Sequence, residues 1–209
     1  DNADAFDMTP NSKLDGDVVS PYRYDEDNNP NGWNNTALET YIKDTYAGGN
    51  NPDEQPGSTS DGAYVNGVKT RGFKLYDDGD DSPTITASTR RLYQKITVEV
   101  GQTYVFSIDS RSEAENVPSE IFMLNEEITT EVGLENGVSD PRVDAYLEVT
   151  NDYNSSKGSE TDNTFTTNTL EFTASTTTVV VYVRAMAAIN KSTEVFYDNI
   201  SLIKKQTAS

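Results

Sequence analysis

Hydrophobic and polar residues alternate with a period of two in several segments of the chain, most clearly in Leu92–Arg111. The alternating apolar residues are Ile96, Val98 and Val100 in its first half and Tyr104, Phe106 and Ile108 in its second half. Such alternation is typical of strands that bury one face in a core. The Gly101-Gln102 pair between the two halves predicts a turn, so we expect a β-hairpin here.

Other segments have the same β character. Strands are predicted at Gly72–Tyr76, Val143–Thr150 and Glu194–Ile203, and a second hairpin is predicted from Thr164–Thr173 and Thr178–Met186 across Ala174-Ser175. Only Thr36–Thr45 has apolar residues at helical spacing. Short strands divided by Gly, Asn, Asp and Pro predict an all-β fold, an antiparallel β-sandwich of jelly-roll type. We expect residues 1–209 to form one domain, with Asp1–Thr9 and Lys204–Ser209 as tails.

Composition and charge exclude several classes of function. The chain has no His and no Cys, so it contains no Ser-His-Asp or Cys-His catalytic site and no imidazole or thiolate zinc site. Its net charge of −19 disfavours binding to a phosphate backbone, and we expect no nucleic-acid partner. The longest apolar run, Val179–Val183, is far shorter than the about 20 residues that a membrane span requires.

Acidic residues are so numerous that a pair of carboxylates alone does not indicate an enzyme, and we expect none. The densest acidic cluster is Asp77–Asp81, whose Gly79 would let carboxylates converge on a calcium ion. This cluster lacks the spacing of an EF-hand loop, and a solvated loop tip is the better explanation of it.

Strand parity predicts a binding surface made of Tyr and Arg side chains. In Thr178–Met186 the residues at odd positions are apolar, which turns Tyr182 and Arg184 away from the core. The same reasoning turns Tyr93, Asp109 and Arg111 outward. Stacking rings and planar donors would suit a sugar ligand. Pairing of the arginines with carboxylates is the alternative, and a site on the loops that carry Tyr76 and Tyr153 is another.

Five segments in a fixed order resemble a known family. They are Asn11–Gly16 (N-x-x-[FL]-[ED]-x-G), Asn29–Trp33 (P-x-G-W), Gly72–Leu75 (G-x-K-L), Tyr93–Tyr104 (Q-x-[IV]-x-V-x-x-G-x-x-Y) and Phe196–Leu202 (F-x-D-N-[IV]-x-L). Together they span nearly the whole chain, which resembles the jelly-roll carbohydrate-binding modules of families 4, 16 and 22. The binding tryptophans common in such modules are missing here, since Trp33 matches the structural position.

The resemblance implies a sandwich whose concave sheet or rim binds a glycan, and a structural calcium on the opposite side held partly by Asp15 and Asp198. Phe196, Ile200 and Leu202 share the parity of Asp198, so we expect its carboxylate to point toward apolar surroundings, where a cation would offset the cost of burial.

The function expected from this resemblance is non-catalytic binding of an extracellular or cell-surface polysaccharide. A neutral β-glucan is preferred because an acidic envelope repels polyanions. The chain would be a monomeric module, on its own or within a larger protein. The alternatives are a structural or adhesive sandwich domain without glycan affinity and a small jelly-roll enzyme that cleaves glycans.

Overall fold

The structure, a computed structural model, describes the backbone of residues 5–7, 57–59, 64–65, 68–69, 72–75, 91–152, 165–185 and 194–206. Side chains are described for 93–152, 165–184 and 194–206. The predicted helix at Thr36–Thr45 and the acidic cluster Asp77–Asp81 lie outside these residues.

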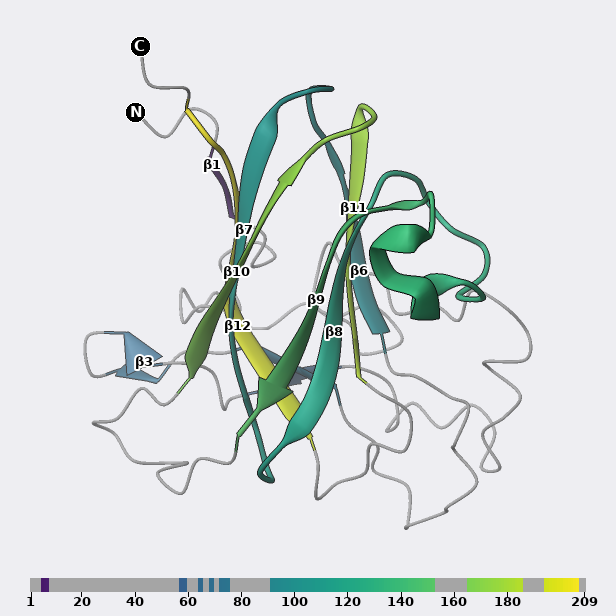
Figure 1. Ribbon diagram of the computed structural model, residues 1–209. Helices are drawn as coiled ribbons and strands as arrows, with labels where there is room; N and C mark the ends of the chain where they lie inside the picture. Colours follow the sequence, from purple (N-terminus) through teal and green to yellow (C-terminus); the bar gives the residue numbers. More distant parts are fainter. Residues whose placement is uncertain are drawn as a thin grey trace.

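Two antiparallel sheets form the sandwich (Figure 1). The six-stranded sheet has the order β10-β7-β12-β5-β2, with β1 paired to β12. Its strands are β10 (Thr166–Thr173), β7 (Thr103–Ser112), β12 (Val195–Lys204), β5 (Gly72–Leu75), β2 (Gly57–Thr59) and β1 (Ala5–Asp7). The four-stranded sheet has the order β6-β11-β8-β9. Its strands are β6 (Arg91–Thr97), β11 (Thr178–Ala185), β8 (Val117–Leu124) and β9 (Val143–Asn151). The predicted all-β antiparallel sandwich is therefore confirmed.

Smaller features complete the described chain. A two-stranded ribbon joins β3 (Tyr64–Val65) to β4 (Val68–Lys69). Strand β1 lies inside the expected N-terminal tail, and Lys204 of the expected C-terminal tail ends β12. Ala5–Asp7 are strand residues rather than tail because they pair with β12, and Lys204 is a strand residue because it pairs with Tyr104 of β7.

Both predicted hairpins are wrong, because each turn carries the chain from one sheet to the other. Strand β6 pairs with β11, whereas β7 pairs with β10 and β12. The two crossing turns lie side by side: Gly101 N–H donates to Ala174 O at 2.8 Å and Ala174 N–H donates to Gln102 O at 2.9 Å. A period of two fixes which side chains face inward, but it does not fix which strand lies alongside.

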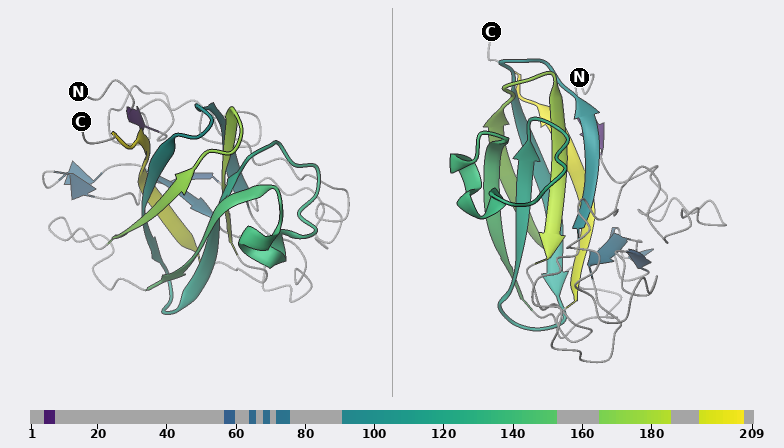
Figure 2. Two further views of the ribbon diagram at one scale, coloured as in Figure 1. Left: turned by 45° about the horizontal axis from the view of Figure 1, so that its top comes forward. Right: turned by 90° about the vertical axis from the view of Figure 1, so that its right-hand side faces the viewer.

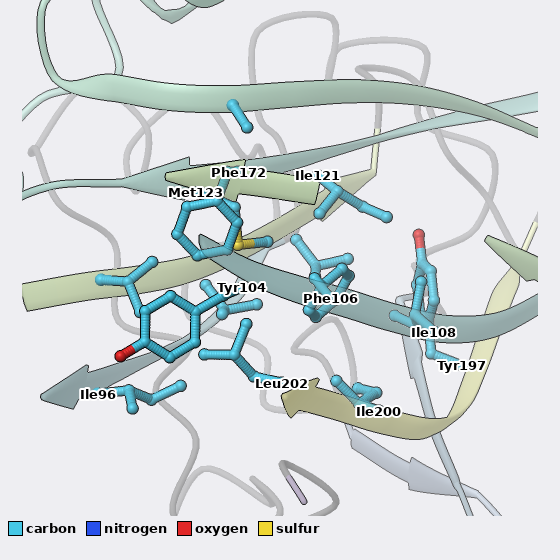
Figure 3. Close-up of a cluster of buried hydrophobic side chains, with 14 of the residues drawn as sticks. Ile96, Tyr104, Phe106, Ile108, Ile121, Met123, Phe172, Tyr197, Ile200 and Leu202 are labelled. Carbon is cyan, nitrogen blue, oxygen red and sulfur yellow. The ribbon is translucent and has the colours of Figure 1, made fainter. Parts of the chain in front are cut away.

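The main core fills the space between the two sheets, where inward-facing side chains from both meet (Figure 3). Tyr104, Phe106 and Ile108 of β7 contribute to it as the alternation predicted. Val179, Val181 and Val183 of β11 contribute from the opposite sheet. The core positions were thus predictable even though the strand partners were not.

A β-bulge in β12 changes which residues face the core. Asp198 is the register partner of Asp109, but the next pair along is Ser201 with Ser107, so β12 carries one extra residue. Asn199 in this bulge has a left-handed backbone with φ of 48°. Tyr197 before the bulge and Ile200 after it both belong to the core.

The bulge overturns the parity predicted for Asp198. Register places Asp198 beside Asp109 and Phe196 beside Arg111, on the outer face of the six-stranded sheet. Asp198 is nevertheless fully buried. Its carboxylate accepts a hydrogen bond from Asn199 N–H at 2.8 Å. A pattern of constant period cannot anticipate an inserted residue.

Substitution of Asn199 tests this backbone. We expect Asn199→Ala to be less stable than Asn199→Gly by about 1–2 kcal/mol, because a left-handed backbone is costly for a residue with a Cβ atom. Both variants lose the same side-chain amide, so their difference in urea unfolding isolates the backbone term. Equal stability of the two variants would show that Asn199 does not hold this conformation.

Candidate functional site

Four aromatic rings form a row across the outer face of the four-stranded sheet. Tyr182 is the register partner of both Tyr93 and Phe122, and Phe122 is the partner of Tyr146. The ring centroids of Tyr93 and Tyr182 are 5.3 Å apart, those of Tyr182 and Phe122 6.3 Å, and those of Phe122 and Tyr146 4.9 Å. Each strand of the sheet therefore contributes one ring to a continuous aromatic surface.

A long connection between β8 and β9 covers the middle of this row. We call residues 125–142 the strap; it includes the 3-10 helix η3 (Leu134–Ser139) and lies over part of the face (Figure 2). Ile128 and Leu134 of the strap pack with Phe122 and Tyr182 in a second hydrophobic cluster. Phe122 is 0% and Tyr182 is 1% exposed, so the two central rings are sealed.

The strap is an integral part of the folded structure, because it packs through buried apolar side chains. Phe122, Leu124 and Leu134 are fully buried in the second cluster. Full burial of each such side chain is worth about 1.5–3 kcal/mol. Detaching the strap would expose all three side chains at once. The free-energy cost would be a large part of the stability of an ordinary domain.

Arg142 stabilises the conformation of the strap through hydrogen bonds to other strap residues. Its guanidinium binds both carboxylate oxygens of Asp140, at 2.8 and 2.9 Å, and donates to the backbone oxygens of Thr130 and Val132, each at 2.8 Å. These hydrogen bonds from Arg142 hold the pKa of Asp140 below its ordinary value, although burial opposes the shift. The strap is therefore preorganised by one bidentate ion pair.

A buried charged cluster links the strap to the sheet. Arg184 Nε donates to Glu120 Oε2 at 2.6 Å, and one terminal nitrogen donates to Glu131 Oε2 at 3.1 Å. The hydroxyl of Tyr182 donates to the strap residue Glu131, and that of Tyr146 donates to Glu120 at 2.9 Å. We call these five residues the Arg184 cluster; it places one cation between two carboxylates.

The electrostatics of the Arg184 cluster follow from burial and charge. Burial lowers the pKa of the Arg184 guanidinium, but its hydrogen bond to Glu120 and the charges of Glu120 and Glu131 outweigh this and raise it. Burial raises the pKa of Tyr146, and the hydrogen bond to Glu120 raises it further. The guanidinium of Arg184 and the phenol of Tyr146 therefore keep their protons at neutral pH.

The structure divides the predicted binding residues between two faces. Tyr93, Tyr182 and Arg184 share the outer face of the four-stranded sheet, as parity predicted. The prediction that Tyr182 and Arg184 stand open to solvent is wrong, because the strap covers Tyr182 and leaves Arg184 only 8% exposed. Arg184 pairs with carboxylates, as the alternative interpretation expected.

Asp109 and Arg111 lie on the outer face of the other sheet, so the predicted single platform does not exist. Asp109 accepts hydrogen bonds from the Thr167 hydroxyl and from Asn199 Nδ2, the latter at 2.8 Å. Arg111 lies 4.2 Å from the ring centroid of Phe196. Both predicted residues are buried, so neither stands open to solvent.

The remaining predicted residues are Tyr76, Tyr153 and Asp15, and all three lie outside the described residues. Asp198 is described and buried. Among the residues that the structure describes, no group of three or more acidic side chains is placed to hold a metal ion.

Sequence reasoning missed half of the site. Glu120 and Phe122 lie in β8, which was not recognised as a strand because Val117–Leu124 does not alternate. The available signal was Glu120, the one charged residue in that apolar run. A buried carboxylate generally has a hydrogen-bonding or charged partner, so it indicates a polar site. Glu131 reaches the site through a tertiary contact that carries no local pattern. For Tyr146 the signal was present, because the alternation of the predicted strand Val143–Thr150 turns it away from the core.

Comparisons with known proteins agree with the fold. No protein family model matches the chain, and no curated protein matches it. A Stig cyclase from Fischerella sp. TAU is similar to it with a TM-score of 0.57 and 13% identity, covering 98% of this chain and 100% of the cyclase. A second cyclase from Fischerella sp. TAU has a TM-score of 0.51 and 12% identity, covering 87% and 88% of the two chains. The chain is also similar to a CBM4 structure at 17% identity with a TM-score of 0.43, covering 80% and 99%.

At 12–13% identity the likenesses to the two cyclases show the sandwich fold alone. Within the described part of the chain, no helix is long and apolar enough to cross a membrane.

Removal of Arg184 tests the charged cluster. We expect Arg184→Met to lower the free energy of unfolding by about 3–5 kcal/mol, because Glu120 and Glu131 would remain buried without their cation. Glu131→Gln keeps an acceptor for Tyr182 and should cost only about 1 kcal/mol. Urea unfolding measures both, and similar small losses in the two variants would contradict this arrangement.

The stabilising effect of the ion pair between Asp140 and Arg142 should depend on pH. The pKa of Asp140 is lowered in the folded state, so its contribution to stability is present above the unfolded pKa and is lost as the pH falls through the folded pKa. We expect Asp140→Asn to melt a few degrees below the parent at neutral pH, and this gap to close below about pH 4. Glu127→Gln, which removes an exposed ion pair of the strap, is the control and should change little at any pH. A gap that does not change with pH would rule out this effect of the ion pair.

Proposed function

We propose that this protein binds an extracellular polysaccharide without cleaving it, on the outer face of the four-stranded sheet. The observation that carries the proposal is the aromatic row beside the Arg184 cluster. Sugar recognition combines apolar ring faces with a few polar groups held in fixed positions. Here Glu120 and Tyr146 are fixed by hydrogen bonds on the same face as the rings.

The accessible part of this face lies at the two edges of the sheet. Tyr93 on β6 and Tyr146 on β9 are half-buried, unlike the two central rings. Glu148, the register partner of Glu120, is exposed and lies beside Tyr146 on the same face of β9. At the β9 edge, the ring of Tyr146 and the carboxylate of Glu148 thus lie together where a sugar could reach them.

The charge of the face favours a neutral glycan. Glu148 is an exposed carboxylate on this face, and the guanidinium of Arg184 is already paired with Glu120 and Glu131. The whole chain carries a net charge of −19, which repels polyanions at long range. We therefore propose a neutral β-glucan as the ligand. The protein would act outside the cell or at its surface, as an accessory module of a glycan-degrading enzyme or as a surface glycan-binding protein.

A structural or adhesive domain without glycan affinity is the second candidate. The strap contacts of Tyr182, Phe122 and Arg184 favour it, because these groups already have partners within the chain. Migration through gels that contain single polysaccharides separates the two functions, since only a binder is retarded. Release of reducing ends during long incubation would instead indicate a glycan-cleaving enzyme.

Substitution of Tyr93 tests the proposed ligand face. We expect Tyr93→Ala to weaken binding to the retarding glycan about tenfold, because loss of an aromatic contact costs about 1–1.5 kcal/mol. Tyr93→Phe keeps the ring and should retain most of the affinity. Thr169→Ala alters an exposed side chain of the six-stranded sheet and serves as the control. Calorimetry that finds Tyr93→Ala unchanged, with its folding intact, would place the site elsewhere.

We further propose a structural calcium ion held partly by Asp15 and Asp198. Asp198 is fully buried and lies beside Asp109 in register, so two carboxylates share this part of the six-stranded sheet. Oxygen donors of this kind suit calcium, and a bound cation would offset the repulsion between the two carboxylates.

Chelation tests the calcium proposal. We expect EDTA to lower the melting temperature of the parent protein, and added calcium to restore it. Asp198→Asn should melt lower and respond less to either treatment, because one ligand has lost its charge. A parent melting temperature that EDTA leaves unchanged would contradict the proposal.

A further inference from the structure

We infer that the proposed site takes the end of a glycan chain and not its interior. This inference rests on the proposed function and specifies its ligand. The two central rings of the row, Phe122 and Tyr182, are sealed from solvent. The two end rings, Tyr93 and Tyr146, are half-buried.

A glycan bound through its interior would have to run along the row. The row crosses four strands, which places its end strands about 14 Å apart at the usual spacing of neighbouring strands. Along that path the strap residues Ile128, Glu131 and Leu134 lie over the central rings. A continuous chain therefore cannot contact both accessible rings through the face of the sheet.

The strap is also closed at its base, where it leaves the sheet. Asn125 N–H donates to Arg142 O at 2.9 Å, which joins the two ends of the strap. The side-chain amide of Asn125 donates to Pro141 O at 2.9 Å and to Asp144 Oδ1 at 3.1 Å. The backbone oxygen of Asn125 accepts from the Thr176 hydroxyl at 2.7 Å, which ties the base to a turn between the sheets. The two ends of the strap are thus held side by side and fixed to the sandwich.

The strap also closes one side of Tyr146. A Cβ atom added to Gly137 would lie only 3.5 Å from Cδ1 of the Tyr146 ring, so the backbone of the strap lies against that ring. The Tyr146 hydroxyl is already held by Glu120. A ligand that contacts Tyr146 is thus confined to the side of the ring away from Gly137, and the neighbouring Glu148 on β9 is exposed. The strap thus ends the accessible surface on one side of Tyr146, as recognition of a terminal unit requires.

The test compares chain ends with chain length, using the polysaccharide that retards the protein in a gel. Calorimetry is carried out on the intact protein with oligosaccharides of that polysaccharide in increasing length. End recognition predicts that the molar affinity stops rising after the first two or three units. It also predicts that equal masses of polymer bind more protein after partial hydrolysis, in proportion to the new chain ends.

A second set of affinity measurements uses oligosaccharides whose chain ends have been modified. Reduction of the terminal sugar to its alditol removes one end, and methylation of the opposite terminal hydroxyl removes the other. We expect one of these changes to lower the affinity at least tenfold. Affinity that keeps rising with length, binding capacity proportional to polymer mass, or insensitivity to both modifications would each overturn the inference. These outcomes leave the proposed function intact, whereas no retardation by any glycan would contradict the function and the inference together.

Discussion

The buried guanidinium of Arg184 is the contact on which the outer layer of this molecule depends. It joins Glu120 of the sheet to Glu131 of the strap and lies 5.0 Å from the ring centroid of Phe122. Two carboxylates at a sealed surface are costly unless a cation and further donors satisfy them. Arg184, with the hydroxyls of Tyr146 and Tyr182, provides those donors, so the strap can close over an aromatic surface.

This arrangement explains why the two faces of the four-stranded sheet differ in chemistry yet are both largely buried. The inner face packs against the other sheet through apolar side chains such as Val181 and Ile121. The outer face carries a smaller hydrophobic cluster under the strap, and the Arg184 cluster adjoins it. A surface that strand parity predicts as solvent-facing has thus become a second core, with accessible rings only at its edges.

Much of the fold could be predicted from the sequence, because alternation reports inward and outward positions directly. It placed Phe106, Ile108 and Val181 in the core and turned Tyr182 and Arg184 to the opposite side. It could not show that the turns at Gly101 and Ala174 cross between sheets, because inward parity is the same for either pairing. It also failed for Asp198, where one inserted residue reverses the face.

The candidate site was less predictable, because exposure depends on a segment distant in sequence. Tyr182 meets Glu131 across 51 positions and Arg184 meets Glu120 across 64. No local sequence pattern indicates that residues 125–142 fold back over the outer face of the four-stranded sheet. The resemblance to carbohydrate-binding modules anticipated a sandwich, but it did not anticipate a covered aromatic row.

Hydrogen exchange of the strap tests most directly the claim that it is a permanent wall. The informative amides are those of Asn125, bonded to Arg142 O, and of Leu134, bonded to Glu131 O. Our account predicts that both exchange only through openings nearly as costly as global unfolding, as amides in the middle of β8 do. Exchange of both amides through a local opening of far lower free energy, while β8 stays protected, would contradict it and identify the strap as a lid.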